Sequence, residues 1–278
     1  MKKVALLTLI STVALASCNM NRTPAAPTGQ IAYGLSSDGK LVTFGLGNPD
    51  ASYVTQNITG LGTDTLVDLD VRNTDGKLYG VASSGKVFMI STENGAATVD
   101  STIANATVVA ADFNPAANRL RVIGTNGKNF RHTLTATPVP ATTGTTDDGS
   151  YTNADSTTNV NLVAAAYTSS FDNSGTGAVA PGTTTALYTI DGNADTLIMN
   201  TVGPQFNTLV TVGKLNVDVM AGMTGFDIAG ANSAYLSSVS GNDTNLYTVN
   251  LTTGATTALS VKLSGIKLKS IALKLAAQ

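Results

Sequence analysis

The amino-acid sequence predicts an all-β fold, a β-propeller with five four-stranded blades. Short runs of alternating or β-branched residues begin at Ile31, and Gly, Asn and Asp interrupt them about every 8–12 residues, as in antiparallel β-proteins. No segment keeps a 3.6-residue hydrophobic period, so almost no helix is expected. The same strand pattern recurs along the chain, and repeats of about 20–50 residues are typical of solenoids and propellers.

The N-terminus has the pattern of an export signal. Lys2 and Lys3 precede an apolar stretch, Val4 to Ala14, and the next residues are Leu-Ala-Ser-Cys18. This ending resembles the bacterial lipobox, in which the cysteine is lipidated and becomes the mature N-terminus. The alternatives are an ordinary signal peptide with a chance cysteine, or a retained signal anchor. We therefore predict a lipoprotein signal peptide over residues 1–17, a lipid on Cys18, and a flexible, proline-containing tether over residues 18–30.

The clearest blade begins at Leu66. Its predicted strands are Leu66–Arg72, Lys77–Ala82, Lys86–Ser91 and Ala97–Ile103. Asp75-Gly76 and Ser84-Gly85 supply hairpin turns, since glycine adopts a positive φ without steric cost. Units with the same pattern follow at Thr107–Leu134, Val160–Val217 and Met223–Leu263.

The first unit, Ile31–Ile58, has only three strands, and a spare strand stands at the C-terminus, Lys267–Leu275. A propeller closes when a terminal strand completes the blade at the other end of the chain, which leaves no open sheet edge. Residues 31–278 are thus expected to form one propeller domain. Two alternatives are six blades, with a degenerate one in Thr135–Val160, and an irregular sandwich.

A polar, low-complexity segment separates two of the blades. Residues 135–157 are mostly Thr, Ala, Gly and Asp, a composition that buries too little apolar surface to fold alone. We predict a long loop over one face of the ring. Long loops on rigid β-scaffolds often carry binding residues. A surface loop without a binding role agrees equally well with this composition.

Composition excludes several classes of function. The 16 basic residues against 18 acidic ones give a net charge of −2, so nucleic acid is not an expected partner. One Cys and one His exclude a disulfide scaffold, a Cys/His zinc site and an iron–sulfur site. Glu93 is the only glutamate, and no nucleophile motif appears. We expect no cofactor and no metal, and the scarcity of acid–base groups favours a non-enzymatic function over an enzyme.

One candidate site is a basic cluster. Arg119 and Arg121 share a strand face, while Arg131 and His132 lie on the neighbouring strand of the hairpin. Guanidinium groups bind carboxylates and sulfates through paired hydrogen bonds, so the cluster can form an anion site. The alternative, which we favour, is a buried ion pair between Arg119 or Arg121 and Asp112.

A second candidate is an aspartate that recurs on the opening strand of three blades, at Asp70, Asp112 and Asp227. Opening strands line a propeller's channel, so three carboxylates there can bind a cation. The ring is incomplete, because Tyr167 and Ala272 stand near the matching places in the other two blades. The simpler expectation is that each aspartate accepts backbone hydrogen bonds at the end of its strand.

Three segments resemble a family of secreted bacterial domains. They are the A-D-F-N-P-x-x-x-R-L-R-V string from Ala111, A-A-A-Y-T-S-S from Ala164, and A-L-Y-T-I-D-x-x-x-D-T-L from Ala186. The family is known as domain of unknown function number 4394, and the resemblance extends from about Ile31 to Leu275. It implies a propeller-like β fold in an exported protein and adds no catalytic residue.

These features predict a monomeric lipoprotein of the cell envelope, anchored to a membrane and facing the periplasm or the exterior. The expected function is a non-enzymatic binding or scaffold module for a protein or glycan. The alternative is a polysaccharide hydrolase or lyase. A channel with two carboxyl groups about 5–9 Å apart would favour the enzyme, and a Thr/Asn-lined face would favour binding.

Overall fold

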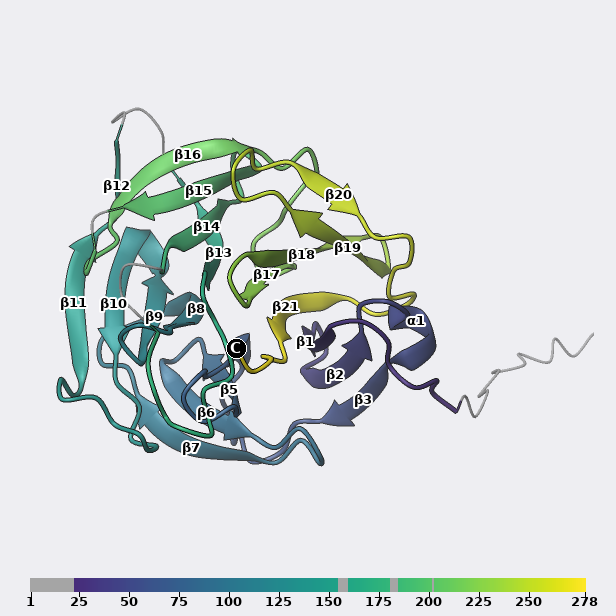
Figure 1. Cartoon of the computed structure of the whole chain (residues 1–278), viewed down its shortest axis with the longest axis horizontal. Helices are drawn as coiled ribbons and strands as arrows, with labels where there is room; N and C mark the ends of the chain where they lie inside the picture. The colour runs from purple at the N-terminus through teal and green to yellow at the C-terminus, as the bar shows by residue number, and fades with distance from the viewer. Residues whose placement is uncertain (1–22, 155–159, 181–184, 202) are drawn as a thin grey trace, which may run out of the picture.

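The protein is a β-propeller with five blades around a central channel (Figure 1). The computed structural model describes residues 23–154, 160–180, 185–201 and 203–278. The prediction of five blades is therefore confirmed, and the six-bladed ring and the irregular sandwich are wrong. The signal peptide and Cys18 lie outside the described residues.

Four blades are formed by consecutive strands, each blade running from the channel outward. Blade 2 contains β4 (Leu66–Val71), β5 (Leu78–Ala82), β6 (Lys86–Ile90) and β7 (Ala97–Thr102). Blade 3 contains β8 (Val108–Asn114), β9 (Arg119–Gly124), β10 (Lys128–His132) and β11 (Thr145–Ser150). Blade 4 contains β13 (Leu162–Tyr167), β14 (Leu187–Asp191), β15 (Thr196–Thr201) and β16 (Thr208–Lys214). Blade 5 contains β17 (Thr224–Ala229), β18 (Ser233–Ser240), β19 (Asp243–Val249) and β20 (Thr256–Ala258).

Blade 1 joins the two ends of the chain, as predicted. Its outer strands are β1 (Ile31–Ser36), β2 (Lys40–Gly45) and β3 (Val54–Asn57), and its inner strand is the C-terminal β21 (Leu268–Leu273). The strands β1 and β21 pair antiparallel, with Tyr33 opposite Ala272. Because the channel strand of blade 1 comes from the far end of the chain, closing the ring links the N-terminal and C-terminal halves.

The prediction of a long loop over residues 135–157 is wrong in part. Residues 145–150 form β11, the outermost strand of blade 3, and β12 (Thr152–Asn153) pairs parallel with β16 at the edge of blade 4. Along β11 only Asp148 is buried. An outer strand covers little core, so a polar sequence forms it as well as an apolar one, and hydrophobic patterning gives no signal for it.

The prediction of a flexible tether is also wrong for the last residues of that segment, which the structure describes. Ala25 donates a backbone hydrogen bond to Ala51 (2.9 Å), and Thr28 accepts one from Gly47 (2.9 Å). Residues 25–30 therefore lie against blade 1 and are not a free linker.

The core lies between the faces of neighbouring blades. Aromatic and aliphatic side chains such as Phe44, Phe88 and Leu120 are fully buried there. At the channel, β17 and β21 approach so closely that a Cβ on Gly225 would lie 2.4 Å from the backbone nitrogen of Ile271. Among the described residues, helix is limited to α1 (Pro49–Ser52) and one 3-10 turn, η1 (Thr125–Gly127), as expected. In the part of the chain described, no helix has the length and apolarity to cross a membrane.

Candidate functional site

The recurring aspartates of the inner strands connect one blade to the next. Asp70 on β4, Asp112 on β8 and Asp227 on β17 each accept a backbone N–H from the neighbouring inner strand, the donors being Phe113 (2.6 Å), Tyr167 (2.9 Å) and Leu273 (2.6 Å). Ser270 on β21 does the same for Leu69 of β4 (3.0 Å). The carboxylates thus accept backbone hydrogen bonds, and these bonds cross blade boundaries.

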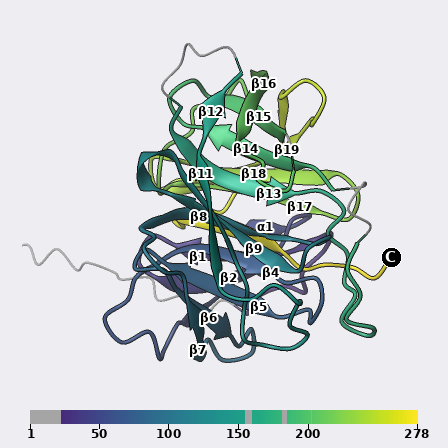
Figure 2. The same cartoon turned by 90° about the vertical axis from the view of Figure 1, so that its left-hand side faces the viewer.

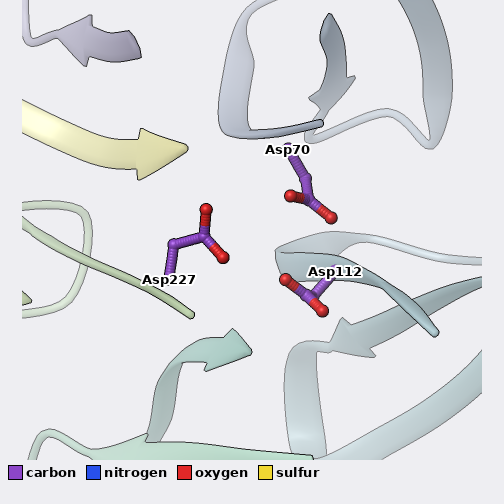
Figure 3. A group of neighbouring side chains, drawn as sticks. All are labelled: Asp70, Asp112 and Asp227. Atoms are coloured by element: carbon purple, nitrogen blue, oxygen red, sulfur yellow. The ribbon is translucent and has the colours of Figure 1, made fainter. Parts of the chain in front are cut away.

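The three carboxylates also meet one another at the channel. Figure 3 shows Asp70, Asp112 and Asp227 pointing toward a common space, and one oxygen of each lies within 4.8 Å of the others. All three residues are buried, with exposed fractions of 4–7%. None of the salt bridges found among the described residues involves them.

Burial raises the pKa of each of these carboxyl groups, because a charged carboxylate loses its hydration there. Mutual repulsion adds to the effect on Asp70 and Asp112. The pKa of Asp227 rises to about 7, and that of the nearby Asp68 to about 6. The cluster can lose its charge by binding protons, or by holding a cation such as Ca²⁺, which binds carboxylate oxygens at about 2.3–2.6 Å.

The strand register corrects the expectation for blade 4 and agrees with Ala272 for blade 1. Asp70 and Asp227 stand opposite Tyr79 and Tyr235, and Ala166 stands opposite Tyr188 in the same way. The matching residue of blade 4 is therefore Ala166, one position before Tyr167. With Ala272 in blade 1, two of the five places carry a methyl group, and the carboxyl groups lie on the other three.

The predicted arginine cluster is mainly structural, but its acidic partner is not Asp112. Arg121 is fully buried, and its Nη1 lies 2.8 Å from Oδ2 of Asp148 on β11. Arg131 binds the same carboxylate through Nε and Nη2, both at 2.7 Å. Asp112 stands directly opposite Arg121 in the sheet, yet its short side chain reaches β13 while the longer arginine extends outward to β11.

The environment of Arg121 is completed by the neighbouring blade. Its Nε donates to the hydroxyl of Tyr167 (3.1 Å), its Nη2 donates to the carbonyl of Pro204 (2.8 Å), and its guanidinium lies 5.6 Å from the ring centre of Phe206. Arg121 therefore holds blades 3 and 4 together and is not open to a ligand.

Arg119 and His132 lie away from this ion pair. Nη2 of Arg119 donates to the carbonyls of Arg131 and Gly144 and to Thr146 Oγ1, while its buried Nε has no hydrogen-bond partner among the described residues. The ring nitrogens of His132 lie 2.8 Å from Thr145 Oγ1 and 2.9 Å from Ser101 Oγ. Burial lowers the pKa of His132, so the imidazole is held neutral between two hydroxyls.

A cavity of about 580 Å³ opens between blades 3 and 4, at the end of the ring where the inner strands begin. We call it the blade 3–4 groove. Its lining comes from the starts of β8 and β13, the β9–β10 and β14–β15 turns, and the residues just before and within β12: Val109, Ile123–Gly127, Ser150, Tyr151, Asn153, Val160–Leu162 and Asn193. None of these side chains is charged. The C-terminal tail leaves the ring on the opposite face (Figure 2).

Sequence reasoning missed this groove. Its residues come from four turns and strand ends that are far apart in the chain, and each of them alone is an ordinary Asn- or Gly-containing turn. The one available signal was the alignment of the blades, which places Asn126 and Asn193 at the same turn of adjacent repeats.

Comparisons with known proteins extend over most of the chain. A family model described as "Domain of unknown function (DUF4394)" matches residues 40–272. No curated protein matches. A structural-genomics protein of unknown function from Bacteroides thetaiotaomicron is similar, with a TM-score of 0.56 and 11% identity over 91% of this chain and 66% of that one. A chain of the nidogen/laminin complex is similar, with a TM-score of 0.51 and 9% identity over 90% of this chain and 99% of that one. At such identities, these likenesses show the fold alone.

Proposed function

This chain belongs to the DUF4394 family of domains of unknown function, and we propose that it is a non-enzymatic binding module of the cell envelope. A lipid on Cys18 anchors it to a membrane, the ring faces the periplasm or the exterior as a monomer, and the partner is a glycan or a protein.

One observation carries this proposal. The blade 3–4 groove, which solvent reaches, is lined by neutral side chains, whereas the channel carboxylates are buried and hydrogen-bonded to backbone. Its volume of about 580 Å³ lies within the roughly 300–1,000 Å³ typical of ligand sites. The accessible groove therefore offers hydrogen bonds and apolar contacts, which are the interactions that a binding protein uses to hold its ligand.

The same observation disfavours the hydrolase. A glycosidase needs two carboxyl groups that reach the scissile bond, about 5–9.5 Å apart. Asp70, Asp112 and Asp227 are each at least nine-tenths buried and form bonds between blades, so a sugar chain cannot reach them without opening the ring.

The lipid anchor follows from the lipobox-like sequence before Cys18. Acyl chains bury methylene groups at about 0.8 kcal/mol each, and several chains give stable attachment. Since the chain is fixed to blade 1 from Ala25 onward, the segment from Cys18 to Ala25 can span at most about 25 Å. The ring is then held close to the membrane surface.

A pull-down with the intact lipoprotein from its native envelope tests the proposal. Asn161→Trp places a large ring in the groove, and Asn232→Trp is the matched control on the exposed β17–β18 turn of the opposite face. We expect wild type and Asn232→Trp to retain the same envelope component and Asn161→Trp to lose it. Equal recovery by all three proteins, or release of new reducing ends from envelope polysaccharide by the wild type, would overturn the proposal.

A further inference from the structure

We propose that the blade 3–4 groove binds a neutral oligosaccharide. This inference rests on the proposed binding function and names the chemical class of the ligand. It follows from how polar and apolar groups are distributed over the groove, from the lack of charge there, and from a second cavity that extends it.

The groove is apolar below and polar around its edge. Ile123 and Leu162 are buried, and Val109 and Val160 are partly buried. The exposed side chains at the edge carry hydroxyl or carboxamide groups: Thr125, Asn126, Ser150, Asn161 and Asn193. A pyranose ring has C–H groups on its faces and hydroxyls around its rim, so it matches this distribution.

Tyr151 adds an aromatic surface to the groove. Its hydroxyl donates to Asn129 Oδ1 (3.1 Å), and its backbone N–H donates to the carbonyl of Gly127 (2.9 Å), so both ends of the residue are fixed. The ring is therefore a rigid wall on which the C–H face of a sugar can pack.

The polar edge has hydrogen-bonding capacity to offer. The side chains of Thr125, Asn126 and Asn161 form no hydrogen bond with any residue that the structure describes. A carboxamide both donates and accepts, and so does a sugar hydroxyl. A carboxamide and a sugar hydroxyl can therefore satisfy each other through paired hydrogen bonds. A charged site would instead favour an ionic ligand.

Asp191, which lines the adjoining second cavity, is already engaged in hydrogen bonds. Asp191 Oδ1 accepts the backbone N–H of Asn161 (3.0 Å) and of Asn193 (2.9 Å), and the residue is 2% exposed. Asp191 thus fixes the two turns that carry these asparagines. A rigid site loses less conformational entropy on binding, which favours affinity.

A second cavity extends the groove outward. It has a volume of about 350 Å³ and shares Asn153 and Val160 with the first, while Thr196 and Leu209–Thr211 of blade 4 line its far side. Asp191 also lines it, and this residue is buried. Two joined cavities accommodate a chain of sugar residues better than a single one, so the ligand is an oligosaccharide.

The test is calorimetric titration of the full-length protein in detergent. The probes are linear neutral hexose pentamers with different linkages and, for comparison, an oligogalacturonate of the same length. The variants are Asn126→Gly, which keeps the positive φ (59°) that this turn requires, and Asn161→Ala. Asn232→Ala on the opposite face is the control, and thermal melts show that all three fold.

We expect at least one neutral pentamer to bind, with little change between low and high salt because the groove is uncharged. Asn126→Gly and Asn161→Ala should each weaken binding at least about tenfold, and Asn232→Ala should leave it unchanged. Binding of the oligogalacturonate alone, or no binding of any neutral pentamer by the folded wild type, would overturn the inference. If the envelope pull-down still depends on Asn161 in that case, the binding function stands and only the ligand class is wrong.

Discussion

The guanidinium of Arg121 and the carboxylate of Asp148 form a buried ion pair across blade 3, with Nη1 and Oδ2 2.8 Å apart and side chains 0% and 2% exposed. The pair joins β9 to the outermost strand, β11. Arg131, on β10 between them, forms a second salt bridge with Asp148. This ion pair attaches β11 to the rest of blade 3. Hydrophobic patterning did not predict this strand.

We expect Arg121→Ala to lower the free energy of unfolding by about 3–5 kcal/mol, because it leaves the carboxylate of Asp148 buried with one partner fewer. Lys128→Ala is the control on the adjacent strand, since its side chain is 50% exposed, and it should change stability by less than about 0.5 kcal/mol. Urea denaturation measures both. Equal midpoints would mean that Arg121 does not hold the blade.

The stability of the protein is expected to fall as pH rises through neutrality, because of the channel carboxyl groups and the nearby Asp68. Their pKa values in the folded protein lie above the ordinary 3.8, so the folded protein retains protons that the unfolded chain releases. The resulting stability is fully present below about pH 4 and is lost as pH rises through the folded-state pKa, about 6 for Asp68 and about 7 for Asp227. Asp227→Asn cannot titrate and should flatten the profile. Denaturation midpoints between pH 4.5 and 8.5 that rise with pH in the wild type would contradict this.

A divalent cation should oppose this loss. At pH 8, above the pKa of about 7 of Asp227, millimolar Ca²⁺ is expected to raise the melting temperature, because a ligand bound only by the folded state stabilises it. The oxygens of Asp70, Asp112 and Asp227 are close enough to share one ion. The effect should be small at pH 5 and in Asp227→Asn. A melting temperature that is independent of Ca²⁺ at pH 8 would leave protons as the only means of neutralising the cluster.

Deleting residues 267–278 should destabilise the whole ring. The deletion removes β21, which pairs with β1, and with it the bonds that Leu273 and Ser270 form with Asp227 and Leu69. Blade 1 then lacks its channel strand and blades 2 and 5 lose a neighbour. We expect one cooperative denaturation transition at a clearly lower midpoint. An unchanged midpoint would show that ring closure contributes nothing to stability.

Cys18→Ala should give a folded protein that membranes no longer retain, since Cys18 lies before the ring and lipidation of this residue is the proposed anchor. Cell fractionation and incorporation of labelled lipid measure the two effects, and a thermal melt serves as the folding control. Membrane retention equal to that of the wild type would disprove the lipid anchor.

The sequence by itself determined the architecture, because the blades are repeats with strong local signals. Alternating strands, Gly-containing turns and a three-stranded first unit beside a spare C-terminal strand were enough to predict five blades and their closure. The recurrence of Asp70, Asp112 and Asp227 also predicted their backbone hydrogen bonds, since a repeated residue at one register position repeats its role.

Only the tertiary structure decided which side chains meet across blades. Asp148 comes from a polar segment without periodicity, so nothing local marked it as the partner of Arg121. The groove depends on the distance between turns of two separate blades, as in the approach of Asn126 to Asn161 and Asn193. Such contacts follow from how one blade packs against the next. A local strand pattern fixes the face on which a side chain lies, but it does not fix which residue of the neighbouring blade that side chain will touch.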